Sequence, residues 1–336
     1  MKLIEKIKEQ ARKSPQRIVL AEGEEVRVIE AAAICREGGI AVPVLLGNEE
    51  RIKKLAHSSG VDLGGIEIID PVSFPEMERY ISLYVESRAG KRVTQEMAER
   101  LIKRPLYFGA IMVRAGDVSG MVAGCKSLTA TVVKAGELML GLKEGVSAPS
   151  SFFVISVPDC PYGEDGNFIY ADAGVNPDPS PGELAEIALL SAESARDILG
   201  WQPRVAMLSF STKGSAGHKL IDKVVEAMKL AKEKAPDLLI DGEFQLDAAI
   251  LPGVAERKVT DKSDVAGKAN ILIFPDLNAG NIAYKMTQYM AKAEAYGPIL
   301  QGFRMLINDL SRGASVQDIV GVIAFTTVQA QIRSSS

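Results

Sequence analysis

The residues best suited to chemistry lie in one short segment near the end of the chain. An apolar run ends at Ile307, and Ser311-Arg312-Gly313 then form a polar loop. A helical pattern starts at Ser315, and its spacing to Asp318 is that of an N-terminal capping box. A helix start offers unpaired backbone N–H groups, and Arg312 adds a planar cation that fits a phosphoryl group. The segment could therefore bind and activate an anion, although the same residue types also suit a turn, a solvated charge and a cap.

A second loop of this kind lies in the middle of the chain. Ser211, Thr212, Lys213 and Gly214 follow the predicted strand 204–210 and precede a predicted helix. A strand, a Gly/Ser/Thr/Lys loop and a helix together form a geometry that can hold a phosphate group. The residue order of a Walker A loop is absent. The loop is therefore a candidate ligand loop, with an ordinary connection as the alternative.

The composition narrows the class of protein. A chain of 336 residues exceeds the usual size of one hydrophobic core, so two domains are expected. The net charge of −4 argues against nucleic acid or a membrane surface as a partner, and no apolar run is long enough to span a bilayer. Three widely spaced cysteines predict a reducing, cytoplasmic location, and two histidines leave little scope for a histidine metal site.

The hydrophobic pattern indicates an α/β fold. Predicted strands at 17–21, 40–46, 66–69 and 119–123 alternate with predicted helices, which is typical of a parallel, doubly wound sheet. After Gly145 the pattern changes, because apolar runs at 152–157 and 167–172 are joined by a turn-rich connection that predicts a hairpin. A second domain is therefore expected to begin near Gly145. Loops at the carboxyl ends of parallel strands are where such sheets bind ligands.

Several ungapped segments resemble phosphate acetyltransferases (phosphotransacetylases). They are Ala206-Met207-Leu208-Ser209-Phe210-Ser211-Thr212-Lys213-Gly214-Ser215-Ala216, Asp241-Gly242-Glu243-Phe244-Gln245-Leu246-Asp247, Ala279-Gly280-Asn281-Ile282, Gly297-Pro298-Ile299-Leu300-Gln301-Gly302 and Asn308-Asp309-Leu310-Ser311-Arg312-Gly313. Weaker matches extend the likeness to nearly the full length.

The resemblance implies a fold and an activity. It implies two doubly wound α/β domains with a cleft between them, an architecture like that of isocitrate and isopropylmalate dehydrogenases. With the pattern changes near Gly145 and Gly297, the expected domains are residues 1–146 plus 297–336, and residues 147–296, the second of which would form a homodimer. The implied reaction is reversible acetyl transfer between coenzyme A and inorganic phosphate, giving acetyl phosphate, with no metal and no tightly bound cofactor.

The resemblance also assigns residues to the site. By position, Ser311, Arg312 and Asp318 match catalytic residues, while Arg88 matches an arginine implicated in coenzyme A binding. The expected substrate-binding residues are Arg88, Lys134, Cys160, Ser211, Thr212, Lys213, Gly214 and Asn281. Two places depart from the family. Gly124-Cys125-Lys126-Ser127-Leu128-Thr129 stands where the family usually reads Gly-Ala-x-His-Thr/Ser-Thr, and Lys134 replaces an arginine and loses its bidentate fork.

The expected mechanism is direct transfer in a ternary complex. Asp318 would act as the base, Arg312 would hold phosphate, and Ser311 would donate to the thioester oxygen. Three alternatives stay open at this point. They are a phosphate butyryltransferase, a non-catalytic acyl-coenzyme A sensor, and, less favoured because no metal-binding aspartate cluster is visible, a dehydrogenase. Asp318 could also serve only as a helix cap.

Overall fold

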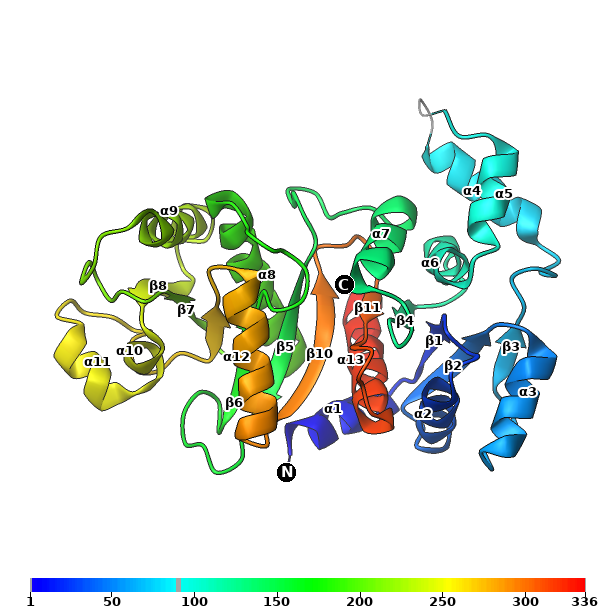
Figure 1. Cartoon of the computed structure of the whole chain (residues 1–336), viewed down its shortest axis with the longest axis horizontal. Coiled ribbons are helices and arrows are strands. Elements are labelled where there is room, and N and C mark those ends of the chain that lie inside the picture. The colour runs from blue at the N-terminus through cyan, green and yellow to red at the C-terminus, as the bar shows by residue number, and fades with distance from the viewer. Residues whose placement is uncertain (1, 89–91, 336) are drawn as a thin grey trace. The chain divides into compact units, whose positions relative to one another are not determined.

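The chain folds into two compact α/β units, which are described separately. The computed structural model describes residues 2–88 and 92–335 (Figure 1). Unit 1 comprises Met1–Lys143 and Phe303–Ser336, and unit 2 comprises Glu144–Gly302. The sequence places the second boundary at residue 297, but strand β10 (Glu294–Gln301) continues through Gly297 and Pro298, with an irregularity in its pairing there. The second boundary therefore lies after Gly302, at the end of β10, and not at the Gly297-Pro298 pair.

Unit 1 is built on a parallel sheet. Among the described residues its strands are β1 (Gln16–Leu20), β2 (Ala41–Leu46), β3 (Glu67–Ile69), β4 (Gly120–Ala123) and β11 (Ile307–Asp309), in the order β11-β4-β1-β2-β3. All neighbouring pairs are parallel, so the carboxyl ends of the strands meet at one edge. The chain builds outward from β1 in both directions, which makes the boundary between β1 and β4 a topological switch point, where open α/β sheets bind ligands.

Helices cover both faces of this sheet (Figure 1). The helices of unit 1 are α1 (Leu3–Arg12), α2 (Val26–Glu37), α3 (Glu49–Ser58), α4 (Met77–Ser87), α5 (Gln95–Ile102), α6 (Pro105–Ala115), α7 (Thr129–Met139) and α13 (Val316–Ser335). Helices α1, α2 and α13 pack together on one face, while α6 and α7 pack on the other. The predicted doubly wound arrangement is confirmed for this unit.

Helix α6 lies in residues 103–118, for which the sequence predicts no helix or strand. Every residue from Leu106 to Val113 is buried, so the helix has no polar face and shows no amphipathic period. Its two ends nevertheless carry residues that commonly begin and end helices. Pro105 occupies the first turn, and Gly116 ends the helix in the left-handed region at φ 79°.

Unit 2 contains a mixed sheet. Its strands are β5 (Ser150–Ser156), β6 (Asn167–Ala171), β7 (Arg204–Leu208), β8 (Leu239–Phe244), β9 (Ile271–Ile273) and β10, in the order β10-β5-β6-β9-β7-β8. The predicted hairpin is present as the antiparallel pair β5–β6, and β10 adds a second antiparallel pair. The remaining pairs are parallel, so the sheet is parallel only in its second half.

The helices of unit 2 also lie on both faces of their sheet. They are α8 (Pro181–Leu199), α9 (Lys219–Lys234), α10 (Leu246–Ile250), α11 (Pro252–Lys258) and α12 (Leu277–Met290). Helices α8 and α9 pack together on one face, and α10 and α12 lie on the other (Figure 1). Within residues 2–88 and 92–335, no helix is both long and apolar enough to cross a membrane.

Candidate active site at the carboxyl edge of the unit 1 sheet

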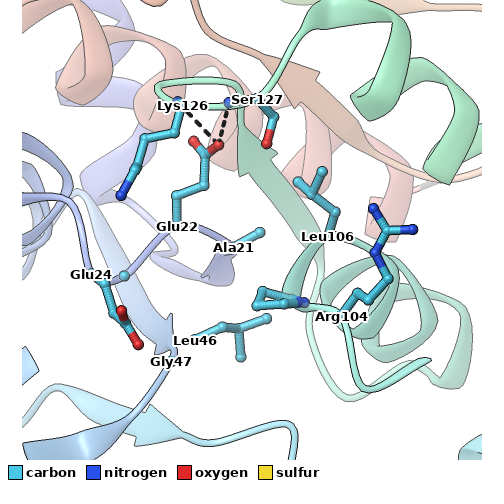
Figure 2. A pocket seen from close by; sticks show the side chains of 11 residues that line it. Ala21, Glu22, Glu24, Leu46, Gly47, Arg104, Leu106, Lys126 and Ser127 are labelled. Atoms are coloured by element: carbon cyan, nitrogen blue, oxygen red, sulfur yellow. Dashed lines mark hydrogen bonds between the residues drawn. The ribbon is translucent and has the colours of Figure 1, made fainter. Parts of the chain in front are cut away.

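The loops after β1 and β4 are joined by one carboxylate. Glu22 follows β1, and its side chain accepts hydrogen bonds from the backbone N–H groups of Gly124 (2.9 Å), Lys126 (3.1 Å) and Ser127 (2.8 Å). Figure 2 shows the last two of these bonds. Hydrogen bonds from three amides satisfy an ionised carboxylate, and they fix the loop after β4 at the switch point. Glu22 therefore organises this edge, a role for which the local sequence gives no signal.

The loop after β11 is tied to the same edge by Arg27. This guanidinium donates to the carbonyl oxygens of Arg312 (3.0 Å) and Ala314 (2.7 Å) and pairs with Glu25 (2.8 Å). The hydrogen bond that Arg27 donates to the Glu25 carboxylate raises the pKa of Arg27, and burial acts against this. Because Arg27 holds the backbone on both sides of Gly313, the conformation of the loop is set while the Arg312 side chain stays exposed.

Ser311, Arg312 and Asp318 lie together on this loop and the helix start that follows it. Ser311 Oγ accepts from the Gly313 N–H at 3.3 Å. The Arg312 side chain has no hydrogen bond or ion pair with any residue in the described ranges. Asp318 Oδ2 accepts from the N–H and the Oγ–H of Ser315, both at 2.8 Å, and the Asp318 N–H donates to Ser315 Oγ at 3.2 Å. The predicted capping box is confirmed, and it occupies only one oxygen of the Asp318 carboxylate.

A buried acid lies beneath the loop. Asp309 ends β11, is fully buried, and its Oδ2 accepts from Thr129 Oγ1 at 2.6 Å. Its Oδ1 has no hydrogen-bond partner among the described residues. Burial raises the pKa of Asp309 to about 7, against the effect of the Thr129 hydrogen bond and with a further increase from Glu22. A side chain at Gly124, where φ is 118°, would overlap Asp309 Oδ1, so glycine is required there.

A cavity of about 340 Å³ opens at the same edge. It is lined by Ala21, Glu22, Gly23, Glu24, Leu46, Gly47, Arg104, Pro105, Leu106, Lys126 and Ser127, from the ends of β1, β2 and β4 and the start of α6 (Figure 2). Its volume lies in the range of small-molecule sites, roughly 300–1,000 Å³. No sequence pattern indicates this cavity, because α6 supplies one wall and its sequence has no amphipathic period.

The other predicted site residues are divided between the two units. In unit 1, Arg88 donates to the Leu138 carbonyl oxygen at 2.9 Å, and Lys134 is exposed beside Glu137 at 3.6 Å. In unit 2, Cys160 is partly buried against the core, and Asn281 donates to the Ala173 carbonyl oxygen at 3.1 Å. The substrate contacts of these residues stay predictions.

The loop of Ser211 to Gly214 in unit 2 is already bound by acidic side chains of its own unit. Glu243 Oε1 accepts from Ser211 Oγ and from the Gly214 N–H, both at 2.8 Å, and Lys213 pairs with Asp241 at 2.5 Å. Thr212 donates its N–H to Ser215 Oγ at 3.0 Å. Carboxylates of the same unit thus hold the hydroxyl, the amide and the ammonium group of this loop, and its predicted substrate contact stays a prediction.

Comparison with known proteins identifies the family. The phosphate acetyl/butaryl transferase family model matches residues 2–327. A phosphate acetyltransferase from Acetivibrio thermocellus is 50% identical over 98% of this chain and 99% of its own length. The chain therefore belongs to the phosphate acetyl/butaryl transferase family. It is an acyltransferase, and it has the function of a phosphate acetyltransferase.

Solved structures agree with the fold. A phosphotransacetylase from Streptococcus pyogenes superposes with a TM-score of 0.90 at 38% identity, and one from Staphylococcus aureus with a TM-score of 0.88 at 40% identity. Each comparison covers 98% of both chains. The predicted two-domain α/β fold is confirmed.

Within the described residues, no group of three or more His, Cys, Asp or Glu side chains is arranged to hold a metal ion.

Proposed function

We propose that the loop after β11 and the start of α13 carry out the reversible transfer of an acetyl group between coenzyme A and inorganic phosphate. The observation that carries this proposal is a grouping of three side chains within Ser311 to Asp318, at the carboxyl edge of a parallel sheet. They provide a hydroxyl, a guanidinium without an ion pair in the described residues, and a carboxylate with only one oxygen in the helix cap. The match to phosphate acetyltransferases over nearly the whole chain supports acetyl as the transferred group. Coenzyme A, acetyl phosphate and phosphate are then its substrates and products.

The reaction is a direct acyl transfer within a ternary complex. An oxygen of hydrogen phosphate attacks the carbonyl carbon of acetyl-coenzyme A, and the carbon–sulfur bond breaks. The sulfur leaves as a thiol after taking up the proton that hydrogen phosphate loses. In the reverse direction the thiol must be deprotonated, and a free thiol with a pKa near ~8.5 is largely protonated at neutral pH. A base near the sulfur therefore accelerates the reverse step.

Each of the three residues has a defined part. Arg312 binds phosphate through two parallel N–H groups, because its side chain is not engaged elsewhere in the described structure. Ser311 uses its hydroxyl as an acceptor for the Gly313 N–H, which leaves its own proton for the developing oxyanion. Asp318 holds the helix cap with Oδ2, so Oδ1 is the atom that accepts the proton.

The proposal also includes a cytoplasmic homodimer that assembles through unit 2. Three free cysteines suit a reducing compartment. Exposed apolar residues line one side of α12, namely Ile282, Met286, Tyr289 and Met290, and such a stripe is typical of a protein interface. Light scattering should give twice the mass of the 36.0 kDa chain, and a single 36.0 kDa species at micromolar concentration would contradict the dimer.

The deciding experiment is release of thiol from acetyl-coenzyme A by the full-length protein, with and without inorganic phosphate. We expect release that requires phosphate and yields acetyl phosphate. Faster release from butyryl-coenzyme A than from acetyl-coenzyme A would instead indicate a phosphate butyryltransferase. Binding of acetyl-coenzyme A without any phosphate-dependent release would indicate a sensor.

A further inference from the structure

The side chain of Asp309 joins two elements at the carboxyl edge of the unit 1 sheet. Asp309 is the last residue of β11, two residues before Ser311, and it is fully buried. Its Oδ2 accepts a hydrogen bond from Thr129 Oγ1 at 2.6 Å, and Thr129 is the first residue of α7. One buried contact therefore ties the start of α7 to the strand that carries the loop of residues 311–313.

The other oxygen of this carboxyl group lies against Gly124. Asp309 Oδ1 has no hydrogen-bond partner among the described residues, and a Cβ at Gly124 would overlap it. The Gly124 N–H donates instead to Glu22, at 2.9 Å. Gly124 thus lies between two acids, and only Glu22 is supplied with several donors. Because a buried charge without a donor costs far more than a neutral acid, this packing suits the protonated form of Asp309.

The groups around Asp309 favour the same neutral form. Burial raises its pKa to about 7, the Thr129 hydrogen bond lowers it, and the charge of Glu22 raises it. Cys125, in the loop after β4, stays an uncharged thiol, because burial raises its pKa to about 12. No cation forms an ion pair with Asp309 in the described part of the chain. Above neutral pH the Asp309 carboxylate therefore requires a donor or water at Oδ1, and the packing against Gly124 must open to admit one.

We propose that Asp309 is a positioning residue of the acyl-transfer site, which through Thr129 holds the loop of Ser311 and Arg312 in place relative to the start of α7. The neutral acid keeps this arrangement, and ionisation loosens it. The role in acyl transfer rests on the proposed function, whereas the contact with Thr129 does not. Asp309 acts on the reaction only through the loop, and it sets the upper pH limit at which the loop stays ordered.

Thr129→Val tests the contact, because it keeps the shape of the side chain and removes the hydroxyl. We expect kcat/KM for phosphate to fall at least fivefold, and Thr129→Ser, which keeps the donor, to stay within about twofold of the parent. Thr327→Val is the matched control. Thr327 is also fully buried in unit 1, but its hydroxyl donates to the Ile323 carbonyl oxygen of its own helix, at 3.0 Å, so kcat/KM should not change.

The pH profile of Asp309→Asn separates positioning from a merely structural role. The amide still accepts from Thr129 but does not ionise in this range. We expect the ratio of kcat/KM in Asp309→Asn to that in the parent to rise at least threefold between pH 6 and 9. The ionisation of phosphate and of the thiol affects both enzymes equally, so it cancels in this ratio. A ratio that stays constant with pH would assign Asp309 a structural role alone and overturn the proposal.

Hydrogen exchange tests the same role without turnover. At pH 7 the backbone amides of residues 310–314 should exchange at least threefold faster in Thr129→Val than in the parent, in Thr129→Ser and in Thr327→Val. Unchanged exchange of this segment in Thr129→Val would overturn the positioning role, even where kcat/KM falls. If the parent protein releases no thiol from acetyl-coenzyme A with phosphate, the proposed function fails, and the exchange rates alone then decide whether Asp309 and Thr129 hold the loop.

Discussion

Two loops in this protein contain similar residue types, but carboxylates of the protein bind the side chains of only one of them. Residues 211–214 of unit 2 and residues 311–313 of unit 1 both follow parallel strands and combine hydroxyls, a cation and a glycine. In the first loop, Glu243 and Asp241 hold the hydroxyl, the amide and the ammonium group. In the second, Arg27 holds only the backbone, and the Arg312 side chain stays exposed. The two loops therefore differ in the pairing of the cation and not in their residue types, and the loop with the unpaired cation is the one that we propose as the site of the reaction.

Asp318 provides the largest test of this comparison, because one of its oxygens accepts two hydrogen bonds, as Glu243 Oε1 does. Asparagine can still accept from Ser315, so Asp318→Asn should keep the cap and remove only the base. We expect kcat to fall on the order of 10²–10⁴-fold with little change in KM. Steady-state kinetics between pH 7 and 9 would measure this loss and its recovery as more thiol ionises unaided.

The outcome separates three roles of Asp318. A loss that recovers at higher pH supports the base, whereas a loss without recovery assigns the carboxylate a positioning role. Unchanged turnover would make Asp318 a cap alone. Ser315→Ala is the matched control for the helix start. It should lower the free energy of unfolding by about 1 kcal/mol and leave kcat within about threefold of the parent.

The pH dependence of stability tests Asp309, the buried acid beneath the loop of residues 311–313. Burial raises the folded-state pKa of Asp309 from 3.8 to about 7. The unfolded chain therefore releases this proton first, and the free energy of unfolding should fall as pH rises from about 4 to 7, by a few kcal/mol at most. Asp309→Asn should lose this part of the pH dependence in urea unfolding measured across that range.

Asp117 gives a control of opposite sign. Burial would raise its pKa, but the hydrogen bonds from Arg79 and Tyr80 outweigh burial and lower it. Its contribution to stability is therefore present above pH 4 and is lost as pH falls below that value. Asp117→Asn should destabilise the protein at neutral pH.

The Asp309 prediction has its own contradicting outcome. If the free energy of unfolding of Asp309→Asn changed with pH as it does in the parent, burial would not raise the pKa of Asp309.

Arg312→Lys asks whether the exposed cation of unit 1 binds phosphate as a fork or only as a charge. Lysine keeps the charge and loses the two parallel donors, so kcat/KM should fall roughly tenfold, or about 1.4 kcal/mol, without loss of stability. Arg100→Lys, at an exposed position on α5, should leave kcat/KM unchanged. Near-parental kinetics in Arg312→Lys would class Arg312 as an ordinary surface charge.

The sequence predicted those elements whose pattern depends on local chain geometry. The alternating strands and helices of unit 1, the β5–β6 hairpin and the Ser315–Asp318 capping box are all present. Helix α6 was missed because burial on all sides removes the helical period from its sequence. The cavity was missed with it, and the role of Glu22 depends on amides more than 100 residues away along the chain. Long-range partners of this kind have no local signal.

The same limit applies to residues 211–214. The predicted order of strand, loop and helix is present there. Asp241 and Glu243, however, belong to another strand, β8, which the parallel pairing of β7 with β8 brings beside the loop. The local sequence therefore does not show that carboxylates hold this loop. The substrate contacts predicted for these residues therefore need a test of their own.

Lys213→Met provides that test, and among the variants of the two loops it carries the smallest expected effect on the kinetics. Asp241 is buried, and although burial alone would raise its pKa, hydrogen bonds from Lys213 and Ser263 lower it. Removing the ammonium group leaves this carboxylate with Ser263 and with Lys232, which is 3.8 Å away. We expect the free energy of unfolding to fall by about 1–2 kcal/mol at pH 7, with the KM values of both substrates within about threefold of the parent. The destabilisation should shrink below about pH 4, because a protonated Asp241 no longer requires the cation. A tenfold rise in either KM without loss of stability would show that Lys213 serves the substrate, and the contrast between the two loops would then fail.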